Sequence, residues 1–184
     1  MKCHIASTVA EKNAILQQRY AIFVEEFNFF EPQNGSEGIE YDAYDEYSLL
    51  LGVWEHKSLI ASCRLVLPND TLGLPTLNAM IIDSVNLQNT QKTAEISRIT
   101  VLAAHRTFKK TIKIMQLIQK ELYRISSDYN ILQWIGAVEP SFLRLLQCST
   151  LPYAPIGPLQ RLIGADRYPV ILTKRDYFVS TKEP

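Results

Sequence analysis

The stretch Glu95-Ile96-Ser97-Arg98-Ile99-Thr100-Val101 decides the fold of this chain. Its β-branched residues predict a strand over 94–102, and apolar residues at helical spacing predict a long helix over 107–126 directly behind it. A strand that runs into a helix in this way presents charged side chains and free backbone amides to a ligand at its carboxyl end. Glu95 and Arg98 are therefore the first candidates for a functional site.

The rest of the chain alternates between strands and helices. Thr8 and Glu11 have the spacing of a capping box, which predicts a helix that runs to about Phe27. The segment 29–46 is expected to be a mobile loop, long enough for a binding element or lid, and the segment 73–75 is expected to be irregular. Further strands are expected at 2–7, 48–54, 59–67, 131–138, 153–158 and 168–173, and a short helix at 140–147. This order fits an α/β (α+β) fold with a mixed, mostly antiparallel sheet and helices on both faces.

The composition is that of one globular domain. A chain of 184 residues with 47% hydrophobic and 21% charged residues can bury one sizeable core without disulfides, so a single domain over 1–184 is expected. Its 19 basic and 19 acidic residues cancel, which argues against nucleic acid as the main partner. No segment has the character of a signal peptide or a membrane span, so we expect a cytoplasmic protein without stable membrane insertion.

Cysteine and histidine residues give no sign of a metal site or a disulfide framework. The three cysteines lack a CxxC spacing, and the three histidines are scattered without a second ligand at a suitable spacing. Reduced, buried thiols are therefore expected, and no metal site is predicted.

The charges are segregated along the chain. Between Arg19 and Lys57 there are many acidic residues and neither Lys nor Arg, whereas the segment 98–124 is basic with the single acid Glu121. This pattern is typical of two solvated faces, but it also suits an enzyme that takes a cationic amine on one side and an anionic acyl donor on the other.

Four charged motifs occur in a characteristic order. They are Arg19-Tyr20-Ala21-Ile22-Phe23, Glu40-Tyr41-Asp42-Ala43-Tyr44-Asp45, Cys63-Arg64-Leu65, and Glu95 with Arg98. This order resembles that of the acyl-homoserine-lactone synthases and the related N-acyl amino acid synthases, which are acyltransferases of the GNAT superfamily. The resemblance implies a GNAT-like fold and transfer of an acyl group. One departure is Phe29, which stands where the homoserine-lactone synthases usually carry a Trp, and which weakens the case for S-adenosylmethionine as acceptor.

Glu95 and Arg98 are the candidate catalytic residues. Acyl transfer to an amine needs a base, and a partly buried carboxylate near the centre of the sheet would have its pKa raised toward neutrality. The alternative is that Glu95 pairs with Arg98 or Arg64 and only holds the sheet together.

The remaining motifs are expected to bind the acceptor. In the homoserine-lactone synthases the pair that matches Asp42 and Asp45 lies at the acceptor side; we favour a network in which such acids orient arginines and only one of them touches the ligand. The guanidinium group of Arg19, Arg64 or Arg98 is able to clamp a carboxylate of the acceptor, and the sequence does not choose among them. The substrate-binding candidates are Arg19, Phe23, Phe29, Asp42, Asp45, Arg64, Thr100 and Val101.

The expected acyl donor is an acyl carrier protein. The loop 102–110 has no glycine, so close approach of its backbone to the diphosphate of coenzyme A is not expected. A basic helix start suits an acidic carrier protein instead, and its phosphopantetheine enters with the donor, so no separate cofactor is predicted. The candidates for binding the carrier protein are Arg106, Lys109, Lys110 and Lys113.

The leading hypothesis is therefore an N-acyltransferase that moves a long-chain fatty acyl group from acyl carrier protein to the α-amine of an apolar or aromatic amino acid such as tyrosine. One alternative is an acyl-homoserine-lactone synthase that uses S-adenosylmethionine. Another is a catalytically inactive module that binds an acyl chain or a carrier protein. Aromatic residues of the C-terminal third, such as Tyr153, are expected mainly in the core, with a minority walling a tunnel for the acyl chain.

Overall fold

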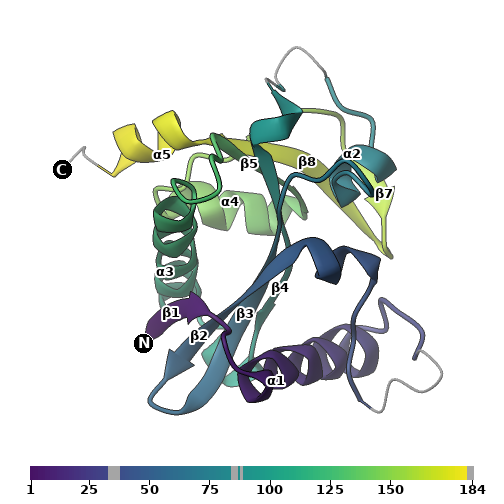
Figure 1. Ribbon diagram of the computed structural model, residues 1–184, viewed down its shortest axis with the longest axis vertical. Coiled ribbons are helices and arrows are strands. Elements are labelled where there is room, and N and C mark those ends of the chain that lie inside the picture. The colour runs from purple at the N-terminus through teal and green to yellow at the C-terminus, as the bar shows by residue number, and fades with distance from the viewer. Residues whose placement is uncertain (33–37, 84–86, 88, 182–184) are drawn as a thin grey trace.

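The computed structural model describes residues 1–32, 38–83, 87 and 89–181 (Figure 1). Its strands form an open sheet in the order β1-β2-β3-β4-β5-β8-β6, and β7 pairs with β8. Strands β4 and β5 are parallel, and the other paired strands are antiparallel. The predicted mixed, mostly antiparallel α/β (α+β) fold is therefore confirmed.

The elements follow the predicted order with a few additions. The strands are β1 (Lys2–Ile5), β2 (Ser48–Glu55), β3 (Ser58–Val66), β4 (Thr93–Val101), β5 (Gln133–Val138), β6 (Ala154–Pro155), β7 (Gln160–Leu162) and β8 (Ala165–Thr173). The α-helices are α1 (Val9–Tyr20), α2 (Pro75–Ala79), α3 (Phe108–Ile125), α4 (Pro140–Cys148) and α5 (Lys174–Ser180). Shorter helical segments are the π-helix η1 (Ala21–Glu26) and the 3-10 helices η2 (Ala43–Tyr47), η4 (Thr90–Lys92) and η5 (Ala103–His105). Across the described residues, no helix has both the length and the apolar character needed to cross a membrane.

Helices cover both faces of the sheet, as predicted. On β3, the side chains of Cys63 and Leu65 belong to the main core, which packs against α3 and α4. Ser62 points to the opposite face, where its hydroxyl hydrogen-bonds with Thr100 of β4, and Thr100 donates to Gln18 of α1. Because successive residues of a strand point to opposite faces, α1 lies on the face opposite to α3 and α4 (Figure 1).

Helix α1 begins at the predicted capping box. The Thr8 hydroxyl accepts from the Glu11 amide at 3.1 Å, and the Glu11 carboxylate accepts from the Thr8 amide at 3.2 Å. The α-helix ends at Tyr20, earlier than expected, because the chain continues as the π-helix η1, after which the Phe27 amide donates to the carbonyl of Ile22. A π-helix shifts the residues that follow it relative to an α-helix, and Phe27, which follows η1, is 45% exposed.

Strands β4 and β5 separate just after the candidate base. Their parallel pairing ends at Glu95 and Ile135, although both strands continue beyond these residues. At Gly136 a larger residue does not fit, because a Cβ atom there would lie 2.8 Å from the carbonyl oxygen of Ile96. Gly136 therefore permits a close approach of the two backbones at the point at which the strands part.

Strand β4 also contains a bulge on its other side. The register between β3 and β4 shifts between Ser62 and Arg64, and Arg98 has a φ angle of 49°. This left-handed conformation is rare for residues other than glycine. It re-aims the Arg98 side chain and marks β4 as a locally strained strand.

Several expectations about local structure are wrong. The segment 73–75 was expected to be irregular, but Pro75 is the first residue of α2, a position that suits its fixed φ angle. Helix α5 was not expected, and the expected strand at 153–158 is reduced to β6, with β7 following it.

The expected loop at 29–46 is described in part. Residues 33–37, in the middle of the segment that is expected to be a mobile loop, lie outside the described residues. The end of the segment is ordered as the helix η2, which places two predicted acidic residues.

Candidate active site

A cavity of about 570 Å³ opens where β4 and β5 separate. Its walls come from η1, α2, β4, the start of α4 and the β7–β8 hairpin, so segments far apart in the chain build it. Its volume is typical of a small-molecule site. Seven predicted site residues line it, namely Phe23, Phe29, Glu95, Arg98, Thr100, Val101 and Arg106.

Glu95 is the buried carboxylate of this cavity, with 2% of its surface exposed. At the start of α2, the Thr76 amide donates to Oε2 at 2.7 Å and the Thr76 hydroxyl donates to Oε1 at 2.8 Å. Burial raises the pKa of Glu95 to about 7, against the opposing effects of these two hydrogen bonds and of the positive charges of Arg64 and Arg98. Within the described part of the chain Glu95 forms no ion pair, so the alternative in which it pairs with Arg64 or Arg98 is wrong.

Three arginines and three acids form a buried ion network beside the cavity. Arg19, at the end of α1, is fully buried, and its Nε donates to Glu40 at 2.6 Å. Its two terminal nitrogens donate to the two oxygens of Asp45 at 2.7 and 3.1 Å. Burial raises the pKa of Asp45, but the bonds and charges of the arginines outweigh burial and leave that pKa below its ordinary value. The ion network consists of Arg19, Arg64, Arg98, Glu40, Asp42 and Asp45.

Arg64 and Arg98 reach the same acids from β3 and β4. Nη1 of Arg64 donates to Asp42 at 2.5 Å and to Asp45 at 3.2 Å. Nε of Arg98 donates to the two oxygens of Glu40 at 3.1 and 3.2 Å, and Nη2 donates to Asp42 at 2.8 Å. The network therefore joins four segments of the chain and balances three positive charges with three negative ones.

Arg19 and Arg64 do not offer a free fork to a substrate. Each side chain is 1% exposed and donates to carboxylates of the ion network. The expectation that one of these two residues clamps the carboxylate of an acceptor is therefore wrong. Arg98 is the arginine of the network that lines the cavity, and 13% of its side chain is exposed.

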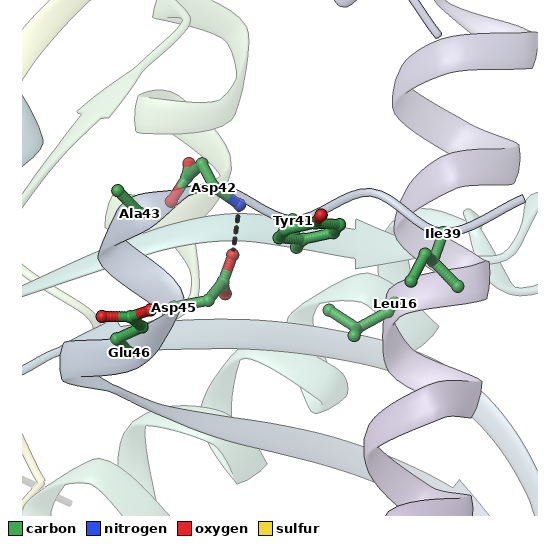
Figure 2. A pocket seen from close by; sticks show the side chains of 7 residues that line it. All are labelled: Leu16, Ile39, Tyr41, Asp42, Ala43, Asp45 and Glu46. Carbon is green, nitrogen blue, oxygen red and sulfur yellow. Dashed lines mark hydrogen bonds between the residues drawn. The ribbon is translucent and has the colours of Figure 1, made fainter. Parts of the chain in front are cut away.

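Asp42 and Asp45 orient arginines, in line with the interpretation that the sequence favoured. Asp45 accepts from the Asp42 amide at 2.8 Å, and Asp42 accepts from the Tyr44 amide at 2.9 Å, so the pair also caps η2. Figure 2 shows both acids at one side of a second pocket, of about 590 Å³, with Leu16 of α1 on the other side. This pocket is separate from the cavity that Glu95 lines.

Phenylalanine rings and arginines form one wall of the cavity. The rings of Phe23 and Phe29 stack with their centroids 6.4 Å apart. The Arg98 guanidinium lies 4.3 Å from the centre of the Phe30 ring, and that of Arg167 lies 5.2 Å from the centre of the Phe29 ring. Such contacts hold cations against apolar surface, so this wall combines apolar area with positive charge.

The other predicted residues lie around the cavity or outside it. The hydroxyl of Thr100 is hydrogen-bonded on the α1 face, so it does not point at a ligand in the cavity. Arg106 donates to both carboxylate oxygens of Glu26 and, through Nε, to the carbonyl of Val101 at 2.7 Å. The carrier-protein candidates Lys109, Lys110 and Lys113 are exposed at the start of α3.

Three residues that matter to the cavity were missed by sequence reasoning. Thr76 holds Glu95, and the one local signal for it is the preceding proline, which favours a helix start. Arg167 of β8 lines the cavity 3.6 Å from Glu139, which lines it too. Nothing near Arg167 or Glu139 in the sequence points to a site, because the long-range pairing of β8 with β5 brings Arg167 next to Glu139.

Residues 18–116, more than half of the chain, match the family described as the acetyltransferase (GNAT) domain. This range contains the four charged motifs of the sequence. No curated protein matches the chain by sequence.

Solved structures with the same fold span nearly the whole chain. TofI, in a ternary complex with an inhibitor and MTA, is 16% identical with a TM-score of 0.70, and covers 100% of this chain and 98% of its own. BjaI with MTA, a CoA-dependent acyl-homoserine lactone synthase, is 19% identical with a TM-score of 0.71, and the match covers 97% of this chain and 87% of the BjaI chain. FeeM, an N-acyl amino acid synthase from uncultured soil microbes, is 14% identical with a TM-score of 0.69, and the match covers 97% of this chain and 93% of the FeeM chain. These likenesses confirm the GNAT-like fold.

The burial of the ion network gives a prediction about stability. Replacing Arg19→Met keeps most of the side-chain volume but leaves the three acids of the buried ion network with two arginines instead of three, so the free energy of unfolding should fall by about 3–5 kcal/mol. Urea denaturation followed by circular dichroism measures this change. Arg124→Met, which breaks an exposed pair with Glu121, is the control and should change the midpoint little. Equal effects of the two substitutions would contradict the prediction.

Proposed function

The chain belongs to the acetyltransferase (GNAT) domain family, and on this premise we propose that it is an N-acyltransferase that moves a long-chain fatty acyl group from acyl carrier protein to the α-amine of an amino acid. The observation that carries the proposal is Glu95, a buried carboxylate in a cavity of about 570 Å³ with a pKa raised to about 7. A carboxylate with that pKa is able to accept a proton at neutral pH. The fold shared with the N-acyl amino acid synthase FeeM supports the same reaction class.

The proposed reaction needs one proton acceptor. The amine nitrogen attacks the thioester carbonyl carbon, and Glu95 takes the proton that the nitrogen loses. The C–S bond then breaks, the amide forms, and the thiolate of the phosphopantetheine leaves and takes up a proton. The Thr76 amide and hydroxyl hold both Glu95 oxygens and so fix the carboxylate in place.

Arg98 and Arg167 are the proposed partners of the acceptor's carboxylate. Both line the cavity, unlike Arg19 and Arg64. The charge of Arg98 is shared with Glu40 and Asp42, whereas Arg167 donates mainly to backbone carbonyls and lies 3.6 Å from Glu139. Arg167 therefore has more unneutralised charge to offer an anion.

The phenylalanine rings beside these arginines favour an acceptor with an apolar or aromatic side chain. Phe23, Phe29 and Phe30 present stacked and edge-on rings to the cavity. An aromatic side chain such as that of tyrosine gains from such contacts in addition to its buried area. Tyrosine is therefore our preferred acceptor.

The start of α3 supports a carrier protein as donor. Lys109, Lys110 and Lys113 are exposed there and form no ion pair within the described chain. Cations at a helix N-terminus oppose the helix dipole, so an anionic partner at this position would relieve an unfavourable interaction. An acidic carrier protein provides such a partner, and the absence of glycine from the loop 102–110 disfavours coenzyme A.

A second candidate is an acyl-homoserine-lactone synthase that uses S-adenosylmethionine. A pocket of about 300 Å³ on the other side of Arg98 is lined by Glu40, Asp42, Tyr20 and Phe30, and acids with aromatic rings suit a cation. The solved structure of BjaI with SAM and isopentyl-CoA has the same fold, with 20% identity and a TM-score of 0.66. Against this candidate, both acids are already paired with arginines.

The test of the proposed function supplies purified protein with one acylated carrier protein and either single amino acids or S-adenosylmethionine. Mass spectrometry should detect an N-acyl amino acid, with tyrosine among the best acceptors, and no acyl lactone. A lactone without acyl amino acid would favour the second candidate. No product with any acceptor would indicate an inactive acyl-binding module.

The role of Glu95 predicts a specific pH dependence. The value of kcat/KM for the wild type should rise with pH through about 7, because the base must lose its proton to act. Glu95→Gln should lower turnover at least about tenfold and remove this rise. Glu25→Gln changes an exposed glutamate of η1 and is the matched control. Unchanged turnover in Glu95→Gln would reduce Glu95 to a structural residue.

The exposed lysines predict charge-dependent use of the carrier protein. Reversing Lys109→Glu and Lys113→Glu together should lower kcat/KM for acyl carrier protein by about tenfold or more and reduce its dependence on salt. The control reverses Lys120→Glu and Arg124→Glu near the other end of α3. Acyl-coenzyme A should be a poor donor for the wild type. Equal losses in both double variants would mean that the lysines are an ordinary solvated helix face.

A further inference from the structure

The hairpin between β7 and β8 turns on two residues at the wall of the large cavity. Leu162 pairs with Ala165, which leaves Ile163 and Gly164 as the turn. Their φ angles are 46° and 72°, so both residues are left-handed. Two-residue hairpin turns with positive φ at both positions strongly favour Asn-Gly or Asp-Gly. Gly164 agrees with this preference, whereas Ile163 does not.

Isoleucine is an unfavourable residue for this conformation. A β-branched side chain at positive φ is crowded by its own backbone, which makes Ile163 a strained residue. Other groups impose the shape of the turn on it. Nη1 of Arg167 donates to the carbonyl of Leu162 and, at 3.0 Å, to the carbonyl of Ile163. Strain of this kind persists only where the surroundings impose it, and it occurs most often at functional sites.

Packing of the core does not account for an isoleucine at this position. Ile163 is 37% exposed and belongs to neither of the hydrophobic clusters that the described residues form. An asparagine would suit the turn better and would remove nothing from those clusters. The isoleucine side chain does line the large cavity, together with Leu162 and Ala165 of the same hairpin. Its place at the cavity is therefore what the strained residue contributes.

The turn lies beside the groups that are proposed to bind the acceptor. Arg167, the proposed partner of the acceptor's carboxylate, is hydrogen-bonded to the Ile163 carbonyl. The ring of Phe29 packs close to the turn, since a Cβ atom at Gly164 would lie 3.5 Å from it. Ile163 is thus next to the proposed carboxylate partner and to a ring that is proposed to contact the acceptor's side chain.

From this geometry we infer that Ile163 is a specificity-determining residue whose side chain contacts the apolar or aromatic side chain of the acceptor, and that the strained turn places it there. The inference rests on the proposed function. A large acceptor side chain buries apolar surface against Ile163, whereas the methyl group of alanine buries little. The chain therefore gives up stability in the turn for selectivity at the cavity, a common relation at functional sites.

The inference predicts opposite changes in stability and selectivity. Ile163→Asn introduces the residue that the turn prefers, so the midpoint of thermal unfolding should rise by about 2–6 °C. The same change removes an apolar contact, so the preference for tyrosine over alanine should fall about fivefold. Ile163→Leu keeps an apolar side chain and should keep most of the preference. An isoleucine that served only the fold would give a lower midpoint and unchanged selectivity.

The test uses N-dodecanoyltyrosine and N-dodecanoylalanine, which the proposed reaction would form from these two acceptors. Isothermal titration calorimetry measures their affinities for the purified protein, so the measurement needs neither carrier protein nor turnover. Circular dichroism measures the midpoint of thermal unfolding for the same samples. The wild type should bind the tyrosine derivative more tightly, and Ile163→Asn should lose most of this difference while unfolding at a higher temperature.

Thr150→Asn is the matched control. Thr150 is also β-branched and exposed, with a φ angle of 61°, and it is not among the described residues that line the cavity. This variant should unfold at a higher temperature and keep the preference of the wild type.

Two results would overturn the inference and leave the proposed function intact. One is a preference for the tyrosine derivative that Ile163→Asn retains in full, and the other is a lower unfolding midpoint for this variant. A wild type that binds neither derivative would count against the proposed function and the inference together.

Discussion

The buried ion network of three arginines and three acids is the constraint on which the rest of the site depends. It draws together the end of α1, the segment that leads into β2, and the strands β3 and β4. Removing any one partner would leave a buried charge uncompensated, so these four segments must meet for the chain to fold. The network does not serve as a general clamp for substrate, because Arg19 and Arg64 use their donors within it. Its structural role is to present Arg98 to the cavity.

The arrangement of the ion network also bears on the pairing and the pKa of Glu95. Because the arginines already donate to the acids of the network, none of them forms an ion pair with Glu95 among the described residues. The charges of Arg64 and Arg98 lower the pKa of Glu95, but burial outweighs them. Thr76 then positions the carboxylate without supplying a charge. The pairing of β4 with β5 ends at Glu95 and Ile135, and the cavity opens in front of Glu95 where the strands part. A base with a pKa near neutrality next to an apolar space is what transfer of an acyl group to an amine requires.

Part of the fold and of the candidate site could be predicted from the spacing of residues that are close together in the sequence. Neighbouring residues determine three elements that the sequence predicted correctly. These are the capping box of Thr8 and Glu11, the strand around Glu95 and the helix behind that strand. The order of charged motifs also predicted which residues gather, although their burial, which decides between binding and structural roles, is a tertiary property. The contacts of Thr76 and Arg167 could not be predicted, because packing across the sheet brings these residues to the cavity.

The most direct test of the central claim is a carbon-13 NMR titration of the Glu95 carboxyl group, assigned by comparison with Glu95→Gln. A neutralised network and a buried carboxylate predict a titration midpoint at about 7. A midpoint near the ordinary glutamate value of about 4.3 would mean that Glu95 is either solvated or paired with an arginine. That result would contradict both the absence of an ion pair at Glu95 and its assignment as the base.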